Sequence, residues 1–216
     1  MRQEGYWYGL PLVLISGGLL GFWLRERSSF LLFSACLFLV LAFLVLNFFR
    51  DPERAIPSHA QAIISPADGR IVQVVRESYE GSPVCRVSIF MSPLDVHVNR
   101  APIAGVVKEV SYRKGAFRAA MEDAASIENE QNVFTLEGEQ GRIVVKQIAG
   151  ILARRIVFWK RPGDSLARGE RVGLIKFGSR VDVLMEPDVT LSIKVGDHVR
   201  AGSSILGTSH LKSDIQ

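Results

Sequence analysis

The pattern of apolar and polar residues divides the chain near residue 50. Two stretches before it, Gly9–Leu24 and Ser28–Phe49, contain no charged residue, and the polar turn at 25–27 separates them. A helix needs about 20 apolar residues to cross the hydrocarbon core of a bilayer. The second stretch reaches this length, and the first does so when the aromatic residues 6–8 are counted as an interfacial belt. The pattern therefore predicts a transmembrane helical hairpin over residues 1–50.

Two other interpretations of this N-terminus fit less well. A signal peptide followed by one anchor would need a basic leading region, but only Arg2 is present, and no small-residue cleavage site precedes the turn. A buried hairpin in a soluble core seldom has so long an uncharged stretch. Both ends of a hairpin lie on one face of the membrane, and Arg2, Arg50 and Arg54 give that face a slight excess of positive charge. We therefore expect the remaining chain on the cytoplasmic face of the cell (inner) membrane.

The chain after residue 50 has the pattern of a β-rich domain. Residues 51–64 resemble a linker, because Pro52 and Pro57 end the preceding helix. Short β-prone runs then alternate with Gly, Pro and Asp, and the pattern predicts a mainly β domain over residues 65–216. A helix is expected only within Phe117–Asn129. The predicted strands are Arg70–Val75, Val84–Phe90, Gly105–Val110, Gly141–Ile148 and Ile151–Val157.

Charge and cysteine content narrow the choice of function. The formal net charge is +4, and basic residues concentrate in one stretch of the domain. They suit either a face for anionic lipid head groups or a solvated strand surface, whereas a nucleic-acid partner is not expected, because no aromatic residues are interleaved. Cys85 is the only cysteine after residue 50, so this domain forms no internal disulfide. The basic stretch comprises Arg154, Arg155, Lys160, Arg161, Arg168, Arg171, Lys176 and Arg180.

Two short segments resemble the paired turns of the barrel-sandwich fold of biotinyl and lipoyl carriers. One is Ser65–Val72, with its Pro-Ala-Asp-Gly turn, and the other is Val195–Gly207, which begins Val-Gly-Asp-His-Val. This resemblance predicts a barrel-sandwich-like β domain. A carrier also needs a lysine at an exposed hairpin tip, usually beside Met, and this chain has no Met-Lys pair. A non-catalytic carrier-like membrane domain therefore remains an alternative function.

The Gly178-Ser179 pair lies in an apolar, β-prone run near the C-terminus. A Gly-Ser bond can break itself when the serine hydroxyl attacks the preceding carbonyl. The amide becomes an ester, elimination and hydrolysis follow, and a pyruvoyl group is left on the new N-terminus. Such a group condenses with amines and acts as an electron sink. Most Gly-Ser pairs are ordinary turns, so the interpretation depends on the motifs that accompany this one.

Three motifs stand in order along the chain: Pro66–Gly69, Asp95–Pro102 and Phe177–Ser179. In this order they resemble phosphatidylserine decarboxylase, the pyruvoyl enzyme of phospholipid synthesis, in its short branch with an N-terminal membrane hairpin. That branch includes archaetidylserine decarboxylase-like proteins. Residues 129–132, Asn-Glu-Gln-Asn, are similar to the family's N-E-R-N segment. The resemblance covers nearly the whole chain after residue 55.

The resemblance implies cleavage between Gly178 and Ser179 into a β chain of residues 1–178 and an α chain of residues 179–216 with a pyruvoyl cap. Gly202-Ser203 is a competing site, because some members carry Gly-Ser-Ser at the cleavage point. The position of Gly202-Ser203 argues against cleavage there, since the pair lies about 20 residues beyond the family's processing serine. We interpret this pair as a turn. The mature protein would be a heterodimer of its own two chains, and a homo-oligomer is possible.

The resemblance also implies roles for individual side chains. Ser179 becomes the pyruvoyl group, Asp68 matches the Asp of a proposed Asp-His-Ser relay, and His97 matches the first histidine of the family segment. Arg100 stands where the second histidine, usually assigned to the relay, is expected. Either His97 serves as the base for self-cleavage or processing differs here, and His97 and Arg100 are the expected substrate-binding residues.

The function implied by the resemblance is decarboxylation of phosphatidylserine, a membrane lipid, to phosphatidylethanolamine. No Cys, His or Asp cluster has zinc-ligand spacing, so we expect no metal. The alternatives from other functional classes are the carrier-like domain and an anionic-lipid-binding protein. In both alternatives the Gly178–Ser179 bond would stay intact.

Overall fold

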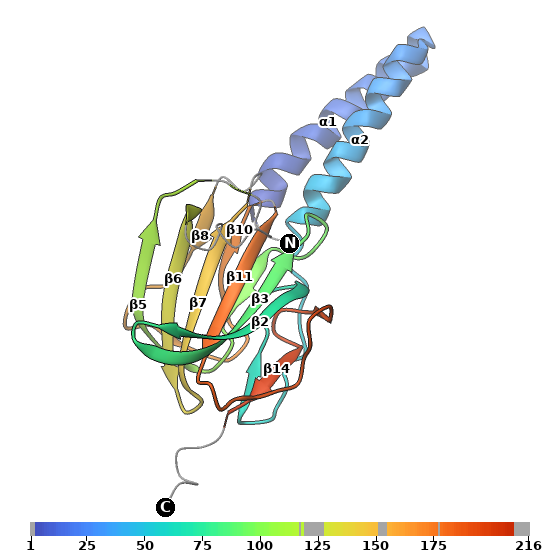
Figure 1. Cartoon of the computed structure of the whole chain (residues 1–216). Helices are drawn as coiled ribbons and strands as arrows, with labels where there is room; N and C mark the ends of the chain where they lie inside the picture. The colour runs from blue at the N-terminus through green and yellow to red at the C-terminus, as the bar shows by residue number, and fades with distance from the viewer. Residues whose placement is uncertain (1–2, 117, 119–127, 151–154, 177, 210–216) are drawn as a thin grey trace, which may run out of the picture. The chain divides into compact units, whose positions relative to one another are not determined.

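The computed structural model describes residues 3–116, 118, 128–150, 155–176 and 178–209. The chain consists of two compact units, Met1–Glu53 and Arg54–Gln216. The first contains the helices and the second the strands, and Figure 1 draws both. The expectation of a mainly β domain preceded by two apolar helices is confirmed.

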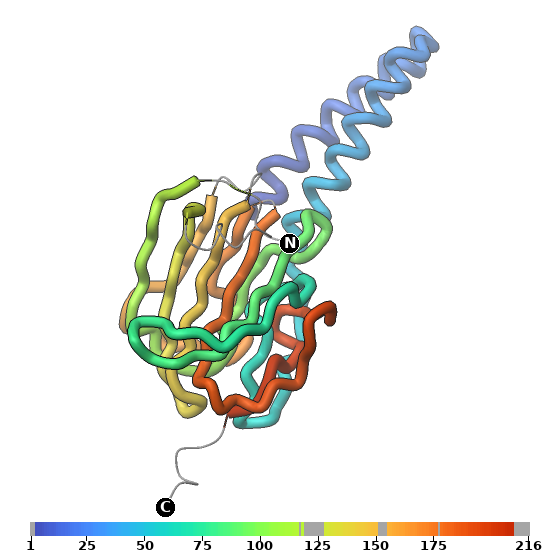
Figure 2. Tube along the Cα trace, in the orientation of Figure 1, coloured from blue at the N-terminus to red at the C-terminus, as the bar shows by residue number. Residues whose placement is uncertain are grey.

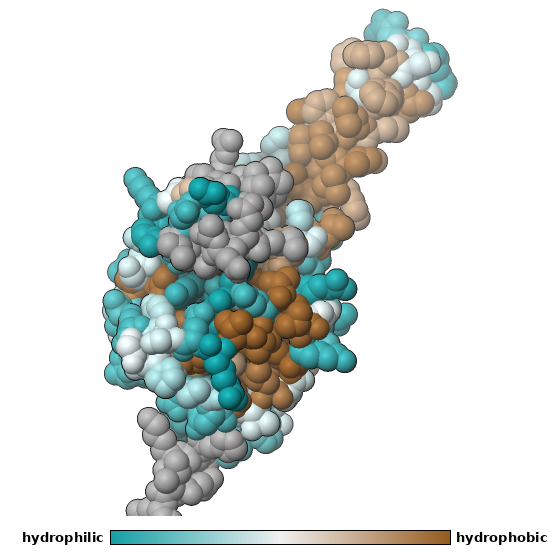
Figure 3. Space-filling model, in the orientation of Figure 1, coloured by the Kyte–Doolittle hydropathy of each residue, from teal (hydrophilic) through white to brown (hydrophobic). Residues whose placement is uncertain are grey.

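The N-terminal unit is a pair of helices, α1 (Gln3–Glu26) and α2 (Ser29–Phe48). Small residues line their contact: Ser16 Oγ donates to the carbonyl of Ala35 at 2.7 Å, and a side chain on Gly9 would collide with Leu46. Most other side chains of the pair are exposed and apolar, which gives it the brown surface in Figure 3. Both helices are long and apolar enough to span a bilayer.

The C-terminal unit is built on an eight-stranded sheet in the order β13-β2-β3-β11-β7-β6-β5-β9. Every pairing in it is antiparallel, and the curved sheet forms half of a barrel (Figure 1). Most of its buried apolar side chains point to one face and form the core. The strands are β2 (Gly69–Tyr79), β3 (Ser82–Met91), β5 (Gly105–Arg113), β6 (Gln131–Gly138), β7 (Gly141–Ala149), β9 (Ser165–Leu166), β11 (Ser179–Met185) and β13 (His198–Val199).

Two three-stranded sheets complete the unit. One has the order β4-β10-β8, formed by Val98–Arg100, Arg171–Ile175 and Ile156–Phe158. The other has the order β1-β14-β12, formed by Ala62–Ile64, Ile205–Thr208 and Thr190–Leu191. In Figure 2 the red C-terminal segment runs beside the blue-green β1, as this pairing requires.

Strand β11 lies in the middle of the large sheet, and all its residues are buried. It pairs with β3 on one side and β7 on the other. Because side chains alternate along a strand, Val181 points into the core, whereas Arg180 and Asp182 point to the opposite face. A strand paired on both edges is held by hydrogen bonds along its whole length.

Some segments differ from the sequence-based expectations. Residues 62–64, assigned to the linker, form β1, and the strand β6 was not predicted. The predicted strand over Ile151–Val157 overlaps β8, although residues 151–154 lie outside the described residues. Most of the helix predicted within Phe117–Asn129 also lies outside them.

The early and late turns meet, as the barrel-sandwich resemblance predicts. Gly69 pairs with Val199 and Arg70 with His198, while Ile71 exchanges backbone hydrogen bonds with the 196–197 turn. Gly69 allows this close packing, since a Cβ there would lie 2.2 Å from the carbonyl oxygen of Phe90. The pairing brings Asp68 beside the C-terminal segment.

Candidate active site

Ser179 begins the central strand β11 and is fully buried. Its Cα lies in register with Met91 of β3 and with Ala149 of β7. Residues directly opposite each other point to the same face of a sheet, so the three side chains are neighbours on the core face. The Ser179 hydroxyl donates to Met91 Sδ at 3.4 Å. Residue 179 is therefore fixed from both sides in a water-poor place.

Gly178 precedes it with a φ of +53°, in the left-handed region that favours glycine. Among the described residues, no atom lies within 4 Å of the position that a Cβ would take. The backbone conformation at residue 178, and not a lack of space, calls for glycine. The bond expected to be cut therefore joins Gly178, which has an unusual backbone conformation, to Ser179, which is held in the central strand.

His97 lies at the same end of the domain as this bond. Its carbonyl accepts a hydrogen bond from the N–H of Ile175, the last residue of β10, and the chain reaches Gly178 three residues later. The ring is buried, and Nδ1 lies 2.9 Å from the carbonyl oxygen of Asp95. A carbonyl oxygen can only accept, so Nδ1 carries a proton, and in the neutral form of the ring the lone pair then lies on Nε2.

Asp95 holds the turn that precedes His97. One of its carboxylate oxygens accepts from the N–H of Ser92 at 2.8 Å, and the other lies 3.3 Å from Nε2 of the exposed His198. The contact with His97 uses the backbone carbonyl of Asp95, not its carboxylate. Asp95 therefore orients the imidazole through the shape of the turn.

Asp68 is buried at the meeting point of the two turns. Its carboxylate accepts from Arg54 at 2.7 Å and from the N–H of Ala201 at 2.7 Å. Burial raises the pKa of Asp68 above its usual value, although the Ala201 N–H and the Arg54 guanidinium act in the opposite direction. Both oxygens thus have partners other than His97 and Ser179, so the uncut chain holds Asp68 in a structural pair.

Arg100 is also buried. Its Nη1 donates to the carbonyl of Gly169 at 3.0 Å, and its backbone N–H donates to the carbonyl of Pro66. It therefore joins the 66–69 turn, strand β4 and the loop before β10. Its role toward substrate remains a prediction.

A group of buried amides on the core face has no role that was expected from the sequence. Asn132 Nδ2 donates to Gln147 Oε1 at 2.9 Å, and Gln147 Nε2 donates to Asn99 Oδ1 at 2.7 Å. Asn99 Nδ2 in turn lies 3.8 Å from Met91 Sδ, the sulfur that receives the Ser179 hydroxyl. Asn99 and Asn132 both lie in motifs described above, the segments 95–102 and 129–132, and Gln147 is a polar residue inside the β-prone run 141–149.

The basic stretch is not one face. Arg180 is buried and paired with Asp182, and Lys160 pairs with Glu170. Arg168 donates to four backbone carbonyls in the segment 57–62, which its guanidinium fastens to the domain. Three members of the stretch are thus engaged within the domain, which weakens the interpretation as a lipid-binding surface.

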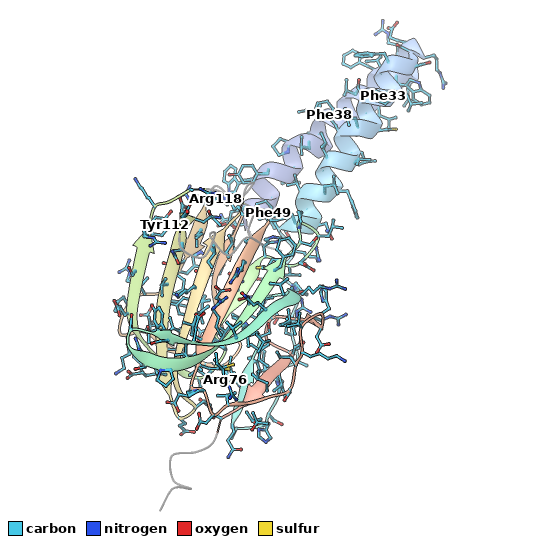
Figure 4. All side chains as sticks on the ribbon, viewed as in Figure 1. Phe33, Phe38, Phe49, Arg76, Tyr112 and Arg118 are labelled. Carbon is cyan, nitrogen blue, oxygen red and sulfur yellow. The ribbon has the colours of Figure 1, made fainter. Side chains whose placement is uncertain are left out.

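Polar contacts also organise the edge of the sheet beside Ala149, whose N–H donates to the carbonyl of Glu130 at 2.9 Å. Tyr112, labelled in Figure 4 at the end of β5, donates to Glu130 Oε1. Burial, followed by that contact with Glu130, raises the pKa of Tyr112 to about 12.

In the described part of the chain, no group of three or more His, Cys, Asp or Glu residues could hold a metal ion.

Comparison with known proteins gives consistent results. The sequence pattern of the phosphatidylserine decarboxylase family matches residues 41–207. The chain is similar to a phosphatidylserine decarboxylase proenzyme of Solibacter usitatus, with 51% identity over 81% of this chain and 83% of the relative. The proenzyme of Salinibacter ruber is 49% identical over 77% of this chain and 76% of its own. That of Geobacter metallireducens is 40% identical over 96% of this chain and 95% of its own, so this match extends into the N-terminal helices.

Proposed function

Because this chain belongs to the phosphatidylserine decarboxylase family, we propose that it cleaves itself between Gly178 and Ser179 and then converts phosphatidylserine to phosphatidylethanolamine. The observation that carries the cleavage site is the pairing of Gly178, at φ +53°, with a buried Ser179 that is fixed at the start of the central strand. Gly202 also has a positive φ, of 80°, but it lies in a turn.

In the first step Ser179 Oγ attacks the carbonyl carbon of Gly178. The bond from that carbon to the nitrogen of residue 179 breaks, the hydroxyl proton passes to this nitrogen, and the amide becomes an ester. Loss of the α-proton of residue 179 then expels Gly178 as a carboxylate. Water finally replaces the nitrogen, which leaves as ammonia, and a keto group remains at residue 179.

His97 is the base that we assign to this sequence. A base must be neutral, and in that form the contact with the Asp95 carbonyl places the proton on Nδ1 and leaves the lone pair on Nε2. Its burial beside the end of β10 keeps it near the Gly178–Ser179 bond. Asp68 contributes from a distance, since Arg54 and Ala201 occupy its carboxylate in the uncut chain.

Residue 179 fits a pyruvoyl group, which proenzymes of this family carry. Its backbone is held by β3 and β7, its side chain lies on the buried core face, and both flanking strands belong to the other product of cleavage. The α chain, residues 179–216, therefore stays in the sheet after the cut. When formed, the pyruvoyl group supplies an electron sink for decarboxylation of a bound amine.

The remaining residues act on the substrate and on its location. We assign to His97 the placement of the substrate carboxylate or the delivery of the proton that replaces carbon dioxide. We assign to Arg100, in the strand β4 that follows His97, a positive charge for substrate binding. The buried setting lowers the local water content, which favours loss of a carboxylate charge. The apolar hairpin keeps the domain at the membrane that holds the lipid, and the arginine distribution supports the cytoplasmic face.

The test is the covalent state of the full chain purified from membranes. We expect two pieces on a denaturing gel, with masses that correspond to residues 1–178 and to residues 179–216 with a blocked N-terminus. Ser179→Ala should give one uncut chain, while the matched variant Ser203→Ala should be cut like the wild type. A wild-type chain that stays whole, with serine at position 179, contradicts the proposal. Conversion of phosphatidylserine in a lipid extract then tests the reaction.

A further inference from the structure

Three buried amide side chains form a row across the core face beside Ser179. Asn132 on β6 and Gln147 on β7 are directly paired, and Asn99 reaches the row from β4 in a different sheet. Their exposed fractions are 2%, 0% and 0%. Gln147 is also in register with Val181, two residues after Ser179 on β11. The row therefore lies one step along the strands from the residue that is converted.

The hydrogen bonds in this row run in one direction. Asn132 donates to Gln147 at 2.9 Å, and Gln147 donates to Asn99 at 2.7 Å. Because the Asn99 oxygen is used as the acceptor, its amide nitrogen must point away from Gln147. It points to Met91 Sδ at 3.8 Å and to the carbonyl of Pro66 at 3.4 Å, both long contacts. The row thus ends at the amide nitrogen of Asn99, which makes only long hydrogen bonds.

Two donors converge on one sulfur at this end. The Ser179 hydroxyl lies 3.4 Å from Met91 Sδ, and the Asn99 amide lies 3.8 Å from the same atom. A thioether is a weak acceptor that takes no proton, so it orients a hydroxyl while leaving its lone pairs available. A methionine side chain has three rotatable bonds and needs neighbours to hold it. Asn99 is such a neighbour.

We propose that Asn132, Gln147, Asn99 and Met91 form a positioning ladder that holds the Ser179 hydroxyl for its attack on the Gly178 carbonyl. The proposal rests on the cleavage site proposed above. In it Met91 sets the direction of the hydroxyl, and Asn99 fixes Met91. The four act as positioning residues in ester formation, the first step of cleavage.

The experiment follows cleavage of the newly made full chain in time. The chain is synthesised in a cell-free system with lipid vesicles and a short pulse of label, and the uncut fraction is read on gels. The variants are Asn99→Asp, which keeps the shape but loses the donor, Gln147→Met, which breaks the row, and Met91→Leu, which removes the sulfur. We expect each to lengthen the half-time of cleavage about tenfold or more, because small misplacement of reacting groups is costly.

Gln140→Met is the matched control. Gln140 is a buried amide that donates to the carbonyl of Ala60, and it lies in the β6–β7 turn, at the opposite end of β7 from Ala149. It should lower thermal stability as Gln147→Met does, without changing the half-time of cleavage. The double variant Asn99→Asp/Gln147→Met should be no slower than the slower single variant, since residues of one unit are not additive.

Hydroxylamine separates the steps. It attacks esters much faster than amides, so it cuts any chain that has formed the ester at residue 179. We expect hydroxylamine not to shorten the half-time of cleavage in the three variants, because ester formation limits their cleavage. Three results would overturn the proposed positioning ladder. Hydroxylamine could restore wild-type cutting in the variants, the variants could keep the wild-type half-time, or Gln140→Met could delay cleavage as much as they do. A wild-type chain that is not cut between residues 178 and 179 would instead overturn the cleavage site.

Discussion

Arg180 donates two hydrogen bonds to Asp182, two residues along the same strand, from Nε at 2.6 Å and from Nη2 at 3.1 Å. Both side chains are almost fully buried, on the face of the sheet opposite Ser179. Arg180 also donates to Ser88 Oγ at 3.0 Å, and Arg86 approaches Asp182 at 3.8 Å, so the pair is tied to β3. This network connects the two proposed chains across the sheet after cleavage.

Asp182→Asn should strongly destabilise the protein, because it leaves two arginines near a neutral amide in a buried place. We expect a loss of about 3–5 kcal/mol in the free energy of unfolding. The measurement is urea unfolding in detergent micelles, with Ser179→Ala as the background so that only one chain unfolds. Glu80→Gln is the control, since it breaks an exposed pair with Arg142 and should cost about 1 kcal/mol or less.

Gly178→Val should slow self-cleavage more than Gly178→Asn. The backbone at residue 178 has a φ of +53°, which asparagine tolerates and a β-branched residue does not. There is room for a side chain among the described residues, so the difference reports conformation and not collision. The half-time of cleavage after pulse synthesis is the measurement. Equal half-times for the two variants would show that the positive φ is not used.

The fold could be predicted from the sequence where the pattern was local. The two apolar stretches gave both helices, and the alternating runs gave β2, β3, β5 and β7 within a few residues. Strand β6 was missed because it begins with the polar pair Gln131-Asn132 and has Thr135 in its middle. These polar residues are satisfied by contacts with neighbouring strands, which a single segment does not reveal.

Less of the site than of the fold could be predicted, because most of its contacts join segments that are far apart in the sequence. Motif order indicated Ser179 and His97, which the structure places at one end of the domain. The partner of Asp68 is Arg54, which comes from a segment that had no expected role in the domain. The contact of Asn99 with Gln147 depends on how two separate sheets pack. Such pairs follow from tertiary structure and leave no spacing signal in the sequence.

His97→Gln should lower the decarboxylation rate constant kcat by about 10²–10⁴-fold, the usual range for loss of a positioned acid or base. Cleaved enzyme is needed for this assay, and the role of His97 in self-cleavage means that the variant should also be cut more slowly. The fraction cut is therefore measured first by mass spectrometry, and the rate is normalised to it. His198→Gln is the matched control, because this exposed histidine contacts Asp95 but lies outside the site. A His97 variant whose cut fraction has normal kcat would contradict the assigned role in decarboxylation.

Asp68 should make stability depend on pH in a defined direction. Burial raises its pKa in the folded protein above the usual 3.8, so the folded state binds this proton more tightly than the unfolded state. Its contribution to stability is then fully present below about pH 3.8 and is lost as the pH rises through the folded-state pKa. The free energy of unfolding of the Ser179→Ala chain, minus that of its Asp68→Asn derivative, should therefore fall over that window in urea titrations. A difference that rises with pH would contradict the raised pKa.

Gly9 should be a glycine of α1 that the helix pairing requires. A Cβ at residue 9 would lie 2.4 Å from Cδ2 of Leu46, whereas one at Gly18 would meet no atom within 4 Å. Close approach of helices in a membrane depends on such small residues. Gly9→Val should therefore weaken helix pairing by about 1–3 kcal/mol, the usual cost of overpacking, while Gly18→Val should not. Energy transfer between dyes at positions 3 and 51 during titration with SDS measures this pairing, and equal curves for both variants would place the contact elsewhere.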